Sequence, residues 1–150
     1  MPEEPGREAT IPNPKLAALA RLVDTWRTSG RHPLLPGVSL HGRTSFAWIE
    51  GGAFLIMRTE IDEPEIPCGI AIIGSDDTAG TFFMLYFDER GVSRKYDVKL
   101  DGDQLEWRRD DPEFSQLFTV AIGRDKMHGL GRMRRKDGDW EDDLSLTYTR

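Results

Sequence analysis

After residue 38 the chain consists of short runs in which apolar side chains are continuous or alternate with polar ones. Turns rich in Gly and Asp separate the runs, and a spacing of about 8 to 12 residues between such runs is typical of antiparallel sandwiches and barrels. Several turns, such as EGG, DERG and DGD, are short enough for hairpins. With an earlier run added as the first strand, the expected strands are residues 25–31, 44–49, 53–61, 69–75, 81–87, 92–100, 104–110, 116–122, 126–133 and 143–149.

A meander of about ten strands buries its edges best by closing on itself. We therefore predict an all-β fold, an antiparallel up-and-down β-barrel. A closed barrel wider than about eight strands begins to have room inside for a ligand. The glycines of GLGRM, residues 129–133, indicate a close backbone approach or a bulge within one of these strands.

The N-terminal segment divides into a tail and one helix. Residues 1–13 are rich in Pro and Glu and have too few apolar groups to offset the entropy of ordering, which predicts a disordered tail. From Pro14 the segment PKLAALARLVDTW has apolar residues at spacings of three and four, which predicts one short amphipathic helix. The 150 residues fit one domain, so residues 14–150 are expected to form the barrel.

Composition excludes several classes of partner. Lys and Arg total 20 against 26 Asp and Glu, a net charge of −6 that disfavours nucleic acid. A single cysteine, Cys68, closes no internal disulfide, and the first residues contain no apolar segment of the kind found in signal peptides. We therefore expect a cytoplasmic protein without a membrane segment.

Strand alternation predicts three charged side chains on apolar faces. Arg94 shares its face with Tyr96, and Arg109 shares its face with Trp107. In the last strand the run from Trp140 to Tyr148 places Asp142 on the inward side. Because a buried charge costs several kcal/mol unless it is paired, Arg94 or Arg109 is expected to meet Asp142 in a polar cluster among aromatics. The candidate ligand-binding residues are Trp48, Tyr86, Arg94, Tyr96, Trp107, Arg109, Asp142 and Tyr148.

Such inward charges have a structural explanation as well as a functional one. Near a barrel mouth they reach solvent by extending their stems, or they form a pair that serves only the fold. Pockets are mostly apolar with few convergent polar groups, so the same cluster also suits the orientation of a ligand carboxylate or carbonyl. The aromatic residues, taken singly, favour barrel filling over contact with a ligand.

Two segments resemble a known class of barrel. The stretch from Asp24 to Gly30 resembles the G-x-W-x-G-x-G motif of lipocalin-like calycins, and residues 146–150, LTYTR, resemble their closing strand. This resemblance implies that Trp26 packs across the barrel floor with Arg150 over it, an arrangement that cation–π attraction favours. The run GRTSFAWIEGGAFLIMR, then YFDERGVSRKY and the terminal W-x-D-x-L-x-L-x-Y-x-R, resembles the DUF1579-like family, with nitrobindin as a more distant relative.

The leading functional hypothesis is a barrel that binds a small apolar or aromatic molecule. An alternative is a cyclase, isomerase or lyase, with Tyr96 or Tyr148 as acid and Asp142 as base. A third is haem binding, as in nitrobindin-like proteins, through His41 or His128, since residues 141–150 contain no histidine.

Other sites and partners have little support in the sequence. No histidine has a companion at i+2 or i+4, so no local metal site is expected, and no cofactor other than haem is considered. The runs AFLIM and TFFMLYF are apolar in both strand phases. They suit packing against the helix or against a second subunit, so a homodimer is a further possibility.

Overall fold

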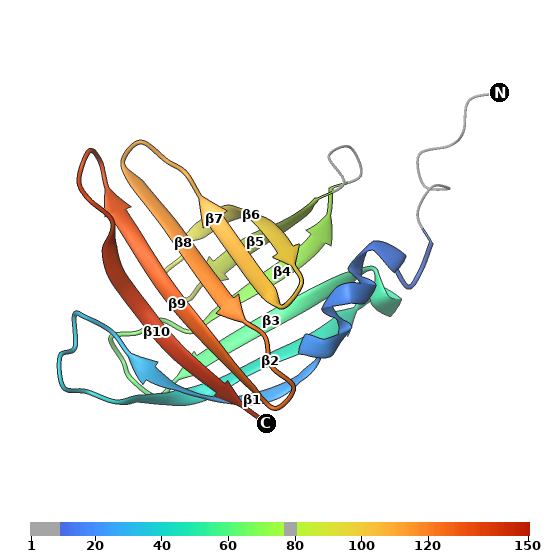
Figure 1. Ribbon diagram of the computed structural model, residues 1–150, viewed down its shortest axis with the longest axis horizontal. Helices are drawn as coiled ribbons and strands as arrows, with labels where there is room; N and C mark the ends of the chain where they lie inside the picture. Colours follow the sequence, from blue (N-terminus) through green and yellow to red (C-terminus); the bar gives the residue numbers. More distant parts are fainter. Residues whose placement is uncertain (1–9, 77–80) are drawn as a thin grey trace.

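The computed structural model describes residues 10–76 and 81–150, which form a closed barrel of ten antiparallel strands in the order β1-β10-β9-β8-β7-β6-β5-β4-β3-β2 (Figure 1). Each strand pairs with its neighbours in sequence, and β1 pairs with β10 to close the wall. The predicted fold class is confirmed. The strands are β1 (Asp24–Arg31), β2 (Leu40–Ile49), β3 (Phe54–Ile61), β4 (Gly69–Ser75), β5 (Phe82–Asp88), β6 (Ser93–Asp101), β7 (Gln104–Arg109), β8 (Phe114–Ala121), β9 (Lys126–Arg135) and β10 (Glu141–Thr149).

Alternation along the strands sorts side chains between the core and the outside. In β6, Tyr96 and Val98 are buried while Lys95, Asp97 and Lys99 are exposed. Most strands have an apolar inward face of this kind, and their inward residues join one core. Sequence periodicity of two is therefore the pattern that builds the barrel wall.

The predicted helix is present as the 3₁₀-helix η1 (Pro14–Leu22), and a second 3₁₀ turn, η2 (Glu50–Gly52), joins β2 to β3. Leu16, Leu19 and Leu22 are fully buried. A 3₁₀-helix has three residues per turn, so a leucine at every third position places all three on one face. Within the predicted tail, residues 1–9 lie outside the described residues. Asn13 is anchored, because its side chain caps η1 and donates a hydrogen bond to Ser75 Oγ at 2.9 Å.

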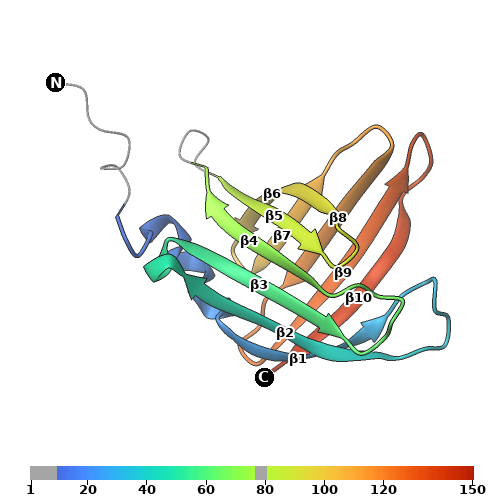
Figure 2. The same cartoon turned by 180° about the vertical axis from the view of Figure 1, so that it is seen from behind.

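The barrel has two unlike ends, which Figures 1 and 2 show on opposite sides of the molecule. We call the end covered by η1 the floor. The opposite end, where the β1–β2, β3–β4, β5–β6, β7–β8 and β9–β10 loops gather, is the mouth. Among the described residues, no helix is long and apolar enough to cross a membrane.

Trp26 fills the floor and is fully buried. Its Nε1 donates to the carbonyl oxygen of Leu22 at 2.9 Å, and the Arg150 guanidinium carbon lies 4.3 Å from the centre of its ring. Arg150 also donates to the carbonyl oxygen of Arg21 at 2.7 Å and to Asp24 Oδ2 at 3.0 Å. The last residue of the chain thus ties η1 and the beginning of β1 together.

Candidate functional site

A cavity of about 420 Å³ lies inside the barrel and is lined by residues of most strands and of the mouth loops. This volume is within the range of about 300–1,000 Å³ that small-molecule sites occupy. Its wall is mainly apolar and aromatic, and Trp107 and Phe118 stack there with ring centres 4.7 Å apart. Other apolar lining residues are Met57, Met84, Leu144 and Leu146.

One polar cluster interrupts this apolar wall. Arg94 Nη1 and the Tyr96 hydroxyl both donate to Oε1 of Gln116, at 2.9 Å and 2.7 Å. The three residues lie on inward faces of β6 and β8, and all three line the cavity. Burial raises the pKa of the Tyr96 hydroxyl, so this group stays a protonated donor at neutral pH.

The charge of Arg94 is not balanced by a bonded carboxylate. Its polar partner is the neutral Gln116 amide, and its guanidinium carbon lies 5.4 Å from the centre of the Phe114 ring. Within residues 10–76 and 81–150, no ion pair to Arg94 is formed. Since buried cations are normally paired, a half-buried guanidinium beside a cavity is suited to an anionic or carbonyl group of a ligand.

Tyr86 lies beside this cluster, in edge-to-face contact with Tyr96 at 6.3 Å between ring centres. Its hydroxyl donates to Asp88 Oδ2 at 2.8 Å, and Arg90 donates to both oxygens of the same carboxylate. Burial and the bond to Asp88 raise the pKa of Tyr86. The hydrogen bonds from Arg90, aided by Tyr86, lower the pKa of Asp88 to about 2. Asp88 is therefore a carboxylate at neutral pH, fully engaged by its own chain.

Tyr148 lines the cavity towards the floor and is 4% exposed. Burial alone raises the pKa of its hydroxyl, and the hydroxyl forms no hydrogen bond within the described parts of the chain. Since no fully buried side-chain nitrogen or oxygen of the described residues lacks a partner, this hydroxyl is open to the cavity and is a second polar group available to a ligand.

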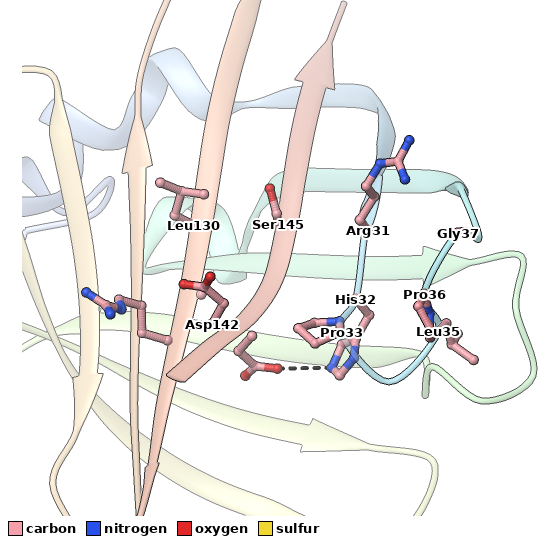
Figure 3. A pocket seen from close by; sticks show the side chains of 12 residues that line it. Arg31, His32, Pro33, Leu35, Pro36, Gly37, Leu130, Asp142 and Ser145 are labelled. Carbon is pink, nitrogen blue, oxygen red and sulfur yellow. Dashed lines mark ion pairs between the residues drawn. The ribbon is translucent and has the colours of Figure 1, made fainter. Parts of the chain in front are cut away.

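A loop residue closes one side of the mouth. His32 Nδ1 accepts a hydrogen bond from the Leu34 backbone N–H at 3.0 Å, which assigns the proton to Nε2. His32 Nε2 then lies within hydrogen-bond distance of Asp143 Oδ1, at 3.0 Å, the contact marked by the dashed line in Figure 3. The two side chains are only 16% and 18% exposed. The pair, which we call the latch, fastens the β1–β2 loop to β10.

The latch separates two hollows. His32, Asp143 and the neighbouring Pro33 line the cavity and also a groove of about 580 Å³ outside it. Figure 3 shows that groove between the β1–β2 loop and the outer face of β9 and β10, where Leu130 and Ser145 lie. Beyond the pair of Arg31 with Ser145, β1 has ended, and the β1–β2 loop lies against β10 in place of a strand.

Asp142 does not take the inward place in the strand that alternation predicts, although it borders the cavity at the rim. The pairing of β10 with β9 shifts between Asp142 and Ser145, a β-bulge that inserts one residue into β10. Asp142 therefore stands opposite Arg132 on the outer face, exposed at the rim, and Asp143 takes the inward place. Gly131 permits this geometry, since a Cβ there would lie 2.8 Å from the Leu144 carbonyl oxygen. The predicted pair of Arg94 or Arg109 with Asp142 is not formed.

The other candidate residues divide into two groups. Tyr86, Arg94, Tyr96, Trp107 and Tyr148 line the cavity with inward side chains, and Asp142 borders it at the rim.

Trp48 and Arg109 are not among the described residues that line the cavity. Trp48 lies at the floor end of β2 and is 36% exposed. Arg109 faces inward but bonds the Phe114 carbonyl oxygen at 2.7 Å and Asp111 at 3.2 Å. The Arg109 guanidinium is thus bonded to residues at the β7–β8 loop.

The histidines proposed for haem do not face the cavity. His41 and His128 are exposed on the outer faces of β2 and β9, and His128 Nδ1 lies 3.4 Å from the Thr147 hydroxyl. Neither ring is placed to bind a group inside the barrel. Within the part of the chain that the structure describes, no group of three or more His, Cys, Asp or Glu residues is placed to hold a metal ion.

Sequence reasoning missed Gln116 and Asp143. Gln116 lies in the same strand phase as Phe114, Phe118 and Val120. The period of two therefore contained the signal for an inward amide. Asp143 had no such signal, because strict alternation assigns it to the outer face and only the bulge reverses it.

No family model matches the chain, and no curated protein matches it. Among solved structures, the chain is similar to the crystal structure of Rv2717c from M. tuberculosis, with a TM-score of 0.66. The similarity covers 91% of this chain and 97% of that chain at 16% sequence identity. At that level of identity the likeness shows a shared barrel fold.

Proposed function

We propose that the barrel binds one small, mainly apolar or aromatic molecule in its cavity, with an anionic or carbonyl group of that molecule held by Arg94. The single observation that carries the proposal is an apolar cavity of about 420 Å³ lined by a guanidinium that no carboxylate of the described residues binds. Tyr96 and Gln116 position this guanidinium, and the aromatic wall supplies the area that an apolar ligand buries.

The proposal also groups the chain with lipocalin-like barrels, and with the DUF1579-like family on the motifs given above. The catalytic alternative has less support, because Asp142, the base that it needs, is exposed at the rim and stands opposite the outward Arg132. The haem alternative likewise requires a histidine inside the barrel, and both of its candidates are outside.

Two fluorescent probes that differ by one charged group test the proposal. Anilinonaphthalene sulfonate carries an anionic group, and phenylnaphthylamine is its neutral counterpart. Both are expected to bind with increased fluorescence. Arg94→Met should weaken sulfonate binding about 10- to 100-fold, the loss expected for a charge-assisted hydrogen bond, and leave phenylnaphthylamine binding nearly unchanged. An equal effect on the two probes would remove Arg94 from the site.

A pair of tryptophan substitutions on β9 locates the binding. Met133→Trp fills part of the cavity that Met133 lines, and it should weaken both probes. Leu130→Trp adds the same ring on the outer face of the same strand, in the groove of Figure 3, and should weaken neither. Probe binding that resists Met133→Trp but responds to Leu130→Trp would place the site in the outer groove and contradict the proposal.

A further inference from the structure

The outer wall of the barrel is apolar over three adjacent strands. The outward side chains of β3, β4 and β5 that make it up are Phe54, Ile56, Ile70, Ile72, Phe83, Leu85 and Phe87, and we call them the β3–β5 face. Phe54, Leu85 and Phe87 remain 40%, 37% and 38% exposed. Figure 2 shows the three strands side by side.

The rest of the wall does not share this character. On β6 the outward residues are Ser93, Lys95, Asp97 and Lys99. An antiparallel sheet with one solvated face normally alternates apolar and polar residues in this way. The β3–β5 face breaks the alternation because β4, most of β5 and the first half of β3 are apolar in both phases, and Arg58 and Glu60 continue the outward side of β3 beyond the face. A contiguous exposed apolar surface of this kind marks an interaction site.

The chain's own helix does not use this face. Leu16, Leu19 and Leu22 of η1 all belong to the core cluster inside the barrel. The helix therefore covers the floor, and packing against η1, one of the two explanations for the doubly apolar runs, does not account for the β3–β5 face.

Opposite charges border the face on β6. Lys95 stands beside Leu85, and Asp97 stands beside Phe83. Both are exposed, and neither forms an ion pair within residues 10–76 and 81–150. Two opposite charges two residues apart on one strand suit contact with a second copy of the same strand. If a twofold axis passes between them, the lysine of each copy lies opposite the aspartate of the other.

The strand register supplies the position of such an axis. Leu55, Ile73, Met84 and Tyr96 form one continuous row across β3 to β6, and all four side chains point inward. We propose that the β3–β5 face binds a second copy of this chain through a twofold axis. The axis runs parallel to this row, across the strands, on the outer side of the wall. Lys95 then faces Asp97 of the partner subunit, and the reciprocal pair forms on the opposite side of the axis, at the same β6 end of the row.

The same rotation brings the apolar residues of the two copies together. Leu85 meets Phe83 of the partner subunit, and Ile56 meets Phe54 of the partner subunit. Face-to-face packing of two sheets about 10 Å apart is an ordinary arrangement for apolar sheet faces. Since the face lies outside the barrel, the dimer does not depend on the ligand that the cavity binds.

Sedimentation velocity over a range of protein concentrations tests the dimer. The unmodified chain is expected to change from monomer to dimer as its concentration rises. Leu85→Glu should raise the dissociation constant at least about ten-fold, since it introduces an unpaired charge at the centre of the contact. Leu130→Glu is the matched control, because Leu130 is 59% exposed on β9, and it should leave the dimer unchanged.

A charge exchange distinguishes the proposed axis from any other contact between copies. Lys95→Glu and Asp97→Lys should each weaken the dimer, and the double variant should restore it. Circular dichroism verifies that each variant folds. A chain that stays monomeric at every concentration, a dimer indifferent to Leu85→Glu, or a double variant no tighter than the singles overturns the proposal.

Discussion

The floor and the mouth of this barrel use the same kinds of side chain for opposite purposes. At the floor, Trp26 and Arg150 contact each other and neighbouring backbone, and the indole is fully buried. Near the mouth, Arg94 and Trp107 line the cavity instead. The difference indicates that stability is concentrated at one end of the barrel and binding capacity at the other.

The contrast follows from what covers each end. The floor receives η1, whose three leucines fill the space between the strands. The mouth receives only loops, held by isolated contacts such as the latch between His32 and Asp143. Loops supply little apolar area, so the interior beneath them stays open.

The largest effect is expected at the floor. Trp26→Ala removes a fully buried indole together with its bond to the Leu22 carbonyl and the stacked Arg150, and should lower the free energy of unfolding by about 3–5 kcal/mol. Urea unfolding followed by circular dichroism measures it. Trp107→Ala is the control at the cavity, where the ring already borders open space, and should cost clearly less. Equal losses would refute the division between the two ends.

A smaller, pH-dependent effect is expected near the mouth. The pKa of Asp88 is about 2 in the folded chain, below its ordinary value of 3.8. Because the folded pKa is depressed, this group's contribution is complete above about pH 4 and is lost as the pH falls towards 2. Asp88→Asn should therefore cost about 1–2 kcal/mol at neutral pH, and less as the solution is acidified.

Parallel urea titrations of Asp88→Asn and the unmodified chain, at neutral pH and between pH 4 and 2, measure the difference in unfolding free energy. A difference that stays constant over this range would show that the carboxylate charge contributes nothing. Glu60→Gln serves as the control, because Glu60 forms an exposed surface pair with Arg43. This variant should change the free energy of unfolding little at any pH.

The smallest effect on stability is expected at the latch. Asp143→Asn keeps an acceptor for His32 but removes the charge, and should change the free energy of unfolding by about 0.5 kcal/mol or less. If the latch holds the β1–β2 loop over the cavity, bound anilinonaphthalene sulfonate should dissociate several-fold faster from this variant. Stopped-flow dilution measures the rate. Asp142→Asn, one residue away on the outer face, should leave the rate as it was.

Most of the fold could be predicted from local patterns of apolar and polar residues. The strand expected at residues 69–75 coincides with β4, because a continuous apolar run between turn residues defines both of its ends. The helix was predicted from the same kind of spacing, and its 3₁₀ form follows from leucines at every third position. Alternation also identified Arg94, Tyr96 and Trp107 as inward residues.

The remaining parts of the site depend on contacts distant in sequence. The β10 bulge lies where β1 leaves β10, more than a hundred residues away along the chain, and nothing within residues 141–149 signals it. The bulge places Asp143 instead of Asp142 in the inward position, where Asp143 contacts His32. The partners of Arg109 were likewise set by the shape of the β7–β8 loop, which alternation does not describe.

The closure of β1 on β10 has a consequence for how the protein is made. Every other strand pair joins neighbours along the chain, so β1 to β9 can form a sheet progressively as they leave the ribosome. The free edges of β1 and β9 have no partner until residues 141–149 are synthesised. A nascent chain of this protein therefore passes through an open, edge-exposed state that ends only with its final strand.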